Sequence, residues 1–320
     1  MLGQGLAGTV WEDFMRPIAT AAALVALAVT LPACSGDDTP ADAPDAVETA
    51  RVKDAAAEPA TAASSAPGLE QLWMATGFDA PEGAALGPEG SYFISNISGD
   101  AVARDGNGFI SKVAADGTVL MMRWAEGLDA PKGMVVHGDT LYVADIGQIV
   151  TFDAHNGTKL DTIVIEGAEF LNDMTVWQDA VLVSDSGTGS IHRLTAEGPQ
   201  LLAASEGWGG INGLLGDGDR LLISTMGQGL LIEWRGEGAE RVLARGMIEA
   251  DGIGLVPGGG YLVSSWPGEI HYVSEDGQVT TLQDTKADGI LQNDLSVFGD
   301  VVIVPNWVPG TVTAWRVVRD

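Results

Sequence analysis

Residues Ala250–Ser265 read ADGIGLVPGGGYLVSS, which is a small polar start, an apolar stretch, a glycine-rich turn, and a second apolar stretch that closes on serine. The same order occurs six times between residues 81 and 306. The copies start at Pro81, Pro131, Leu171, Ile211, Ala250 and Gln292. Apolar residues alternate with period two inside each copy, and the breaks are Gly, Asp and Asn. This pattern predicts β-strands joined by hairpins.

The spacing of the copies predicts the architecture. The second residue of each copy follows the previous one by 39 to 50 positions. These second residues are Glu82, Lys132, Asn172, Asn212, Asp251 and Asn293. A repeat of about 40–50 residues is typical of propeller blades, which are four-stranded sheets that cannot bury their own faces alone. We therefore expect an all-β, six-bladed β-propeller over residues 69–320.

The two ends of this region predict how the ring closes. The last copy is followed by one more strand, Thr311–Val318, and then lacks an outer strand. The segment LWMATGFDAPEG from Leu72 is similar to MRWAEGLDAPKG from Met122, where an outer strand precedes the next blade. An N-terminal strand is therefore expected to complete the last blade, which leaves no open edge in the ring.

The N-terminus has the pattern of an export signal. An apolar run over Ile18–Leu31 is short for a membrane span and ends in LPAC at Cys34. This ending resembles the lipobox of bacterial lipoproteins, which predicts a signal peptide over 1–34 and a lipid on Cys34. A membrane helix that stays attached is the alternative. Glu12 and Asp13 fit a signal poorly, so Met15 is a candidate start.

Residues 35–68 are predicted to form a disordered tether, because they are rich in Ala, Asp, Pro, Ser and Thr and poor in large apolar side chains. Cys34 is the only cysteine, so no intrachain disulfide can form. We expect an exported protein in the periplasm or at the cell surface, bound to a membrane only through its lipid. Its oligomeric state is not predicted.

The net charge of the chain argues against partners that are bound through their phosphates. With 44 acidic and 16 basic residues, the net charge is −28. Nucleic acids and anionic lipid headgroups need Lys and Arg to bind their phosphates, so we expect neither as a partner. Solubility in a saline habitat explains this acidity without any specific function.

The six second residues are expected to meet on the propeller axis, because the first strand of each blade lines the central channel. Buried polar groups without partners cost about 1–3 kcal/mol each. Glu82, Asn172, Asn212 and Asp251 offer only oxygen ligands, which favours calcium, with magnesium, manganese or zinc as alternatives. In a second interpretation Lys132 neutralises Glu82 or Asp251, and the remaining groups bond to each other and to water.

Four motifs connect these residues to a known family. The chain resembles the senescence-marker-protein, gluconolactonase and luciferin-regenerating-enzyme family and, more distantly, the paraoxonases, which are six-bladed propellers with a central divalent cation. The motifs are APEG at Ala80–Gly83, FLND at Phe170–Asp173, ING at Ile211–Gly213 and ADGIGL at Ala250–Leu255. The resemblance implies Glu82, Asn212 and Asp251 as metal ligands. It implies Asn172 either as a further ligand or as a contact to substrate.

The resemblance also implies a chemistry, namely hydrolysis of a lactone or ester in which the cation polarises the carbonyl and a channel carboxylate activates water. Asp251 is the first candidate for that carboxylate and Asp173 or Asp294 its substitutes, with Asn172 as a further catalytic residue. The candidate substrate-binding residues are Lys132, Phe170, Asn293 and Asp294.

One position departs from the gluconolactonase pattern. Those members have an arginine where this chain has Phe170. This difference leaves room for a more apolar lactone or ester than a sugar acid lactone, since Phe170, Trp208, Trp266 and Trp307 are all expected near the channel. Packing between blades is the alternative role for these aromatic residues.

A rival function comes from a different class of protein. The chain can be a non-catalytic propeller, similar to NHL-type modules, with a structural cation and a face that captures a ligand or protein. The absence of a proton-transfer histidine favours this interpretation, because the histidines do not recur at one position of the repeat. The fold alone does not select between the two functions.

Overall fold

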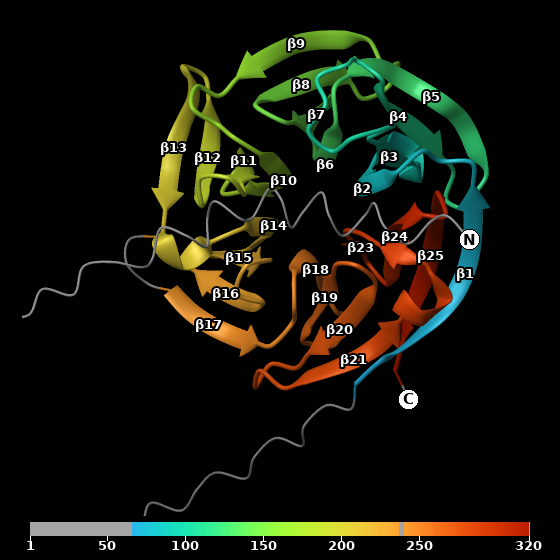
Figure 1. Ribbon diagram of the computed structural model, residues 1–320, viewed down its shortest axis with the longest axis vertical. Helices are drawn as coiled ribbons and strands as arrows, with labels where there is room; N and C mark the ends of the chain where they lie inside the picture. The colour runs from blue at the N-terminus through green and yellow to red at the C-terminus, as the bar shows by residue number, and fades with distance from the viewer. Residues whose placement is uncertain (1–65, 237–239, 320) are drawn as a thin grey trace, which may run out of the picture. The chain divides into compact units, whose positions relative to one another are not determined.

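The computed structural model describes residues 66–236 and 240–319, which form six antiparallel sheets arranged around a central axis (Figure 1). This confirms the predicted all-β, six-bladed propeller. The predicted signal peptide over 1–34, with Cys34, lies outside the described residues, as does the 35–68 tether up to residue 65. Gly68 already belongs to the first strand. Across the described ranges no helix is long and apolar enough to cross a membrane.

Each blade runs from an inner strand at the axis to an outer strand at the rim. Blade 1 is β2 (Pro81–Leu86), β3 (Tyr92–Asn96), β4 (Gly108–Val113) and β5 (Val119–Leu128). Blade 2 is β6 (Pro131–His137), β7 (Thr140–Asp145), β8 (Gln148–Asp153) and β9 (Lys159–Val164). Blade 3 is β10 (Leu171–Trp177), β11 (Ala180–Asp185), β12 (Ser190–Thr195) and β13 (Gly198–Ala204).

The remaining blades repeat this plan, with a divided inner strand in the last one. Blade 4 is β14 (Ile211–Asp217), β15 (Arg220–Thr225), β16 (Leu230–Trp234) and β17 (Glu240–Arg245). Blade 5 is β18 (Ala250–Leu255), β19 (Tyr261–Ser265), β20 (Glu269–Val273) and β21 (Val279–Asp284). Blade 6 is β22 (Leu291–Gln292), β23 (Ser296–Phe298), β24 (Val301–Val308), β25 (Thr311–Val318) and β1 (Gly68–Thr76). Short 3-10 turns lie at Pro88–Gly90, Glu206–Trp208 and Lys286–Asp288.

The N-terminal strand closes the ring as predicted. β1 pairs antiparallel with β25 along its whole length, from Gly68 opposite Val318 to Thr76 opposite Thr311. It thereby becomes the outer strand of blade 6, so residues from both ends of the described chain complete a single sheet (Figure 1).

The hydrophobic core lies between the blades and leaves the axis free. Six apolar clusters each join two neighbouring blades around the ring. In one of them Phe93 and Ile110 of blade 1 pack against Leu141 and Phe152 of blade 2. Because a blade is covered on both faces, strands such as β3 and β19 are buried at every position. Inter-blade packing therefore stabilises the fold without filling the channel.

Candidate metal centre

A β-bulge lies at the start of the first five inner strands. In β2, Pro81 and Ala84 pair with residues only two apart on β3, so Glu82 and Gly83 together face Ser95. The same shift occurs in β6, β10, β14 and β18. An extra residue bends a strand and re-aims the side chains beside it. The bulge thus sets the second residue of each motif, which we call the polar ring, at one level of five blades.

In four blades a serine on the second strand satisfies the bulged backbone. Its Oγ accepts a hydrogen bond of 2.8 or 2.9 Å from the N–H of the third motif residue. These serines are Ser95, Ser184, Ser224 and Ser264. Ser184 Oγ also donates to the carbonyl of Asn212 at 2.7 Å, and Ser224 Oγ donates to that of Asp251. Ser184 and Ser224 therefore each link the third motif residue of one blade to the polar-ring residue of the next blade. Sequence reasoning missed this role, although serine recurs at one position in four copies.

Removing one of these serines gives the first testable prediction. Ser224→Ala leaves the Gly213 N–H without an acceptor and the Asp251 carbonyl without that donor, both in a buried region. We expect a loss of about 2 kcal/mol in the free energy of unfolding, measured by urea titration. Ser98→Ala, which removes a surface hydrogen bond to Asp79, should cost only about 0.5 kcal/mol. Equal stabilities of the two variants would contradict the bracing role.

Two carboxylates of the polar ring are buried. Glu82 is 6% exposed and its Oε2 accepts no hydrogen bond, while Asp251 is 2% exposed. Burial, followed by the charge of Asp251, raises the pKa of Glu82 well above its usual value, against a smaller opposing effect of Lys132. Burial and the charges of Asp173 and Glu249 raise the pKa of Asp251 to about 8. Two buried acids from blades 1 and 5 therefore act on one another across the ring and lack a matching positive charge.

The two asparagines of blades 3 and 4 are oriented by hydrogen bonds. Asn172 Nδ2 donates to Ser186 Oγ at 3.2 Å, and Asn212 Nδ2 lies 3.1 Å from Met226 Sδ. With the amide nitrogens held in this way, neither Oδ1 accepts a hydrogen bond from a described residue, and the Asp251 carboxylate accepts none either. Glu82, Asn172, Asn212 and Asp251 thus present oxygen atoms without donors in one buried ring.

Lys132 does not form the salt bridge considered from the sequence. Its Nζ donates to the carbonyls of Ala101 at 2.9 Å and Ala130 at 3.0 Å, and lies 4.4 Å from the centre of the Phe170 ring. Within the described ranges it forms no ion pair with Glu82 or any other carboxylate. Burial lowers the pKa of Lys132 to about 8, although the charge of Glu82 acts in the opposite direction. The ammonium is therefore bound to backbone carbonyls, and Phe170 packs beneath it.

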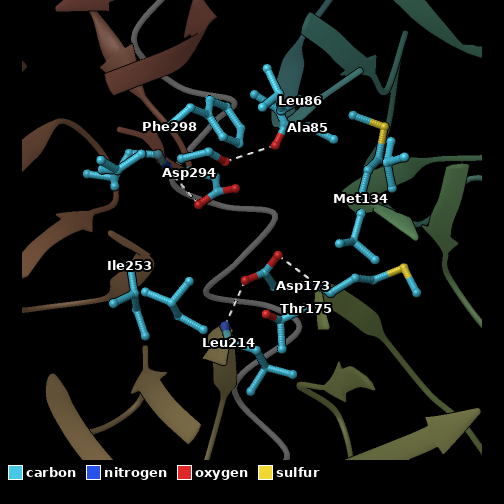
Figure 2. Close-up of a pocket in the computed structure, with 17 residues that line it drawn as sticks. Ala85, Leu86, Met134, Asp173, Thr175, Leu214, Ile253, Asp294 and Phe298 are labelled. Atoms are coloured by element: carbon cyan, nitrogen blue, oxygen red, sulfur yellow. Dashed lines mark hydrogen bonds between the residues drawn. The ribbon is translucent and has the colours of Figure 1, made fainter. Parts of the chain in front are cut away.

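Asp173 and Asp294 line a cavity along the inner strands, next to the polar ring (Figure 2). The cavity measures about 330 Å³ and its walls are mostly apolar. Asp173 accepts hydrogen bonds of 2.7 Å from the N–H groups of Met174 and Leu214, and Asp294 accepts one of 2.6 Å from Leu295. Burial raises the pKa of Asp173 to about 7, and raises that of Asp294 well above its usual value, assisted by neighbouring carboxylates.

The remaining candidate residues from the sequence, which are Asn293 and three tryptophans, lie in three different places. Asn293 is buried in blade 6, where its N–H donates to the Pro305 carbonyl at 2.9 Å. Trp208 lies away from the ring and packs against Trp234 at 5.9 Å between blades 3 and 4, which is the packing role that the sequence left open. Trp266 directly follows β19, and Trp307 is the second-last residue of β24. Their rings form a T-shaped pair with centroids 5.7 Å apart.

The composition of the ring determines which metal centre it can form. Among residues 66–236 and 240–319, no three side chains drawn from His, Cys, Asp and Glu are arranged to hold a metal by themselves. A centre here therefore needs the asparagine oxygens together with Glu82 and Asp251. Such an all-oxygen set fits a hard cation such as calcium better than it fits zinc.

Comparisons with known proteins establish the fold. No protein-family model and no curated protein matches the sequence. A gluconolactonase from Xanthomonas campestris superposes with a TM-score of 0.59 at 20% identity, covering 80% of this chain and 91% of its own. Virginiamycin B lyase from Staphylococcus aureus gives 0.58 at 13%, covering 79% and 100%. A chain of the nidogen/laminin complex gives 0.55 at 13%, covering 70% and 89%. Two enzymes and a member of a protein complex thus share this fold.

Proposed function

We propose that the protein is a divalent-metal-dependent hydrolase of lactones or esters, exported and lipid-anchored at Cys34. One observation carries the hydrolase assignment. Glu82 Oε2 is buried without a partner, and no residue within 66–236 and 240–319 donates a hydrogen bond to the side-chain oxygens of Asn172, Asn212 or Asp251. A buried charge without compensation costs several kcal/mol, so a cation on these oxygens explains the arrangement. The likeness in fold to a gluconolactonase supports the reaction class.

In this proposal Glu82, Asn172, Asn212 and Asp251 hold the cation. Calcium suits the ligands best, and magnesium or manganese can replace it. When bound, the cation polarises the substrate carbonyl and stabilises the charge that develops on its oxygen. The contacts of Asn172 Nδ2 with Ser186 Oγ and of Asn212 Nδ2 with Met226 Sδ use the amide nitrogens, which leaves the amide oxygens for the cation.

A carboxylate of the chain moves the proton. Asp251 was the first candidate, but a carboxylate that holds a cation is a weak base. Asp173 lines the adjoining cavity, and its pKa of about 7 leaves a substantial ionised fraction at neutral pH. We therefore assign to Asp173 the acceptance of a proton from the attacking water, with Asp294 as the other carboxylate in the same cavity.

Metal removal tests this function. We expect the full-length protein, dialysed against EDTA, to lose hydrolysis of a panel of lactones and aryl esters and to regain it with calcium. Calcium should also raise the thermal melting temperature, because a ligand that binds only the folded state stabilises it. Hydrolysis that is equally fast in EDTA and in calcium would contradict the mechanism.

A non-catalytic binding propeller is the second candidate. The histidines of the blades give it support, because His192 bonds to Ser190 and His271 to Thr281, both on third strands away from the ring. The nidogen/laminin neighbour shows that this fold also occurs in a protein complex. A rise in melting temperature with calcium, without turnover of any substrate in the panel, would favour this function.

A further inference from the structure

On the face where the inner strands begin, the connection between the second and third strands of blade 1 is longer than the same connection in the other blades. In blade 1, residues 97–107 join β3 to β4, and we call this segment the strap. The corresponding connections of the other blades are tight turns of two to four residues. Because the second strand of each blade ends beside the start of its inner strand, the strap and these turns surround the mouth of the channel above the polar ring (Figure 1).

The strap is fixed to the polar ring itself. Lys132 Nζ donates to the Ala101 carbonyl in the strap at 2.9 Å. The Gly106 N–H donates to Asp129 Oδ1 of blade 2 at 3.2 Å, and the Ile97 N–H donates to the Ala80 carbonyl at 3.1 Å. Lys132 is therefore a positioning residue that holds the strap, and its ammonium is not available as a free cation for a substrate.

The strap and blade 6 form an apolar wall on one side of the mouth. Ile97 and Ala101 pack in a buried cluster to which Trp307 contributes a partly buried ring, and Trp307 also contacts Trp266. Val102, which follows Ala101 in the strap, is 43% exposed. Trp307 and Val102 thus offer accessible apolar surface, which we call the mouth wall.

The opposite side of the mouth is formed by the turns that hold the two asparagines of the polar ring. The equivalent turns of blades 3 and 4 start at Ser186 and Met226, which hold the amides of Asn172 and Asn212. A substrate carbonyl directed at the polar ring from this side would place the rest of its molecule toward the mouth wall. Glu82, Asp173, Asp251 and Asp294 place four carboxylates along the channel, and none of them forms an ion pair with a described residue, so an anionic substrate would meet repulsion.

From this asymmetry, and resting on the hydrolase function above, we propose that the substrate is a neutral lactone or ester that carries an apolar substituent. Trp307 and Val102 receive that substituent, while the carbonyl is directed at the cation that the polar ring would hold. Contact of the substituent with the mouth wall removes apolar surface from water and so favours substituted over unsubstituted substrates.

A matched pair of lactones tests the proposal in the calcium-loaded, full-length protein. δ-Decalactone and δ-valerolactone share one ring and differ by a pentyl chain. We expect kcat/KM to be at least tenfold higher for δ-decalactone. Trp307→Ala and Val102→Asp should each bring this ratio close to one. Leu160→Asp also replaces an exposed apolar side chain with a carboxylate, but it lies on the outer strand of blade 2. This variant should leave the ratio unchanged. Melting temperatures establish that each variant is folded.

The outcomes separate the two proposals. Hydrolysis of both lactones at similar kcat/KM, or a preference that survives in both mouth-wall variants, overturns the mouth wall and leaves the hydrolase standing. A preference for an anionic sugar acid lactone that disappears in Arg104→Gln also overturns it, because Arg104 is an exposed cation on the strap. No hydrolysis of any lactone or ester, despite stabilisation by calcium, overturns the hydrolase and the mouth wall with it.

Discussion

Replacing Asp251 with asparagine is expected to remove most of the stabilisation that calcium gives this protein. Without cation, the wild type must keep Asp251 buried near other carboxylates, and the variant loses that repulsion. We expect the EDTA-treated variant to be at least as stable as the wild type. With calcium at about 1,000 times its Kd, the wild type should gain about 4 kcal/mol, and the variant should gain far less. Hydrolysis by the variant should fall by about 1,000-fold.

Asp294→Asn is the matched control for this experiment. Asp294 is 7% exposed, burial and the charges of Asp173, Asp251 and Glu82 raise its pKa, and it lines the cavity next to the ring. Its replacement should preserve most of the calcium-dependent rise in melting temperature. An equal rise in Asp251→Asn and the wild type, or loss of the rise only in Asp294→Asn, would place the cation elsewhere in the channel.

Removal of β1 is expected to have the second large effect, on stability. This strand pairs with β25 over its full length, Ala75 is buried in the cluster between blades 6 and 1, and Trp73 Nε1 donates to the Ala115 carbonyl of blade 1. Its loss would expose both that cluster and the edge of β25. We expect a chain that starts at Phe78 to lose about 5 kcal/mol or more, equivalent to a fall of about 10–20 °C in melting temperature.

A chain that starts at Ala66 is the control for this truncation, because it keeps all of β1. It should melt at the temperature of the full-length protein. Calorimetry of the three proteins compares these expectations directly. If the chains starting at Ala66 and Phe78 melt together, the closure of blade 6 by β1 contributes little to stability.

The repeat alone was enough to predict the fold and the membership of the polar ring. Its period equals the length of one blade, and the second residue of each copy differs in type while its position is constant, so Glu82, Asn212 and Asp251 could be identified without coordinates. The same spacing did not reveal the bulge that aims them. A bulge is a mismatch between two paired strands, and it appears only when their register is known.

The partners of Lys132 show a second limit of the sequence. Its charge and position predicted a bond to Glu82 or Asp251, but its ammonium reaches the carbonyls of Ala101 and Ala130 instead. Backbone carbonyls are present at every residue, so no residue type marks the ones that will accept a hydrogen bond.

By itself, the sequence determined the number of blades, the strand that closes them and the residue types that meet at the axis, because these properties depend on periodicity and composition along one chain. Only the tertiary structure decided which of those groups have partners and which do not. Hydrogen bonding and burial depend on distances between blades, as with Ser224 and Asp251 or Lys132 and Ala101. Those distances arise from packing across the ring, which brings together residues that are far apart in the chain.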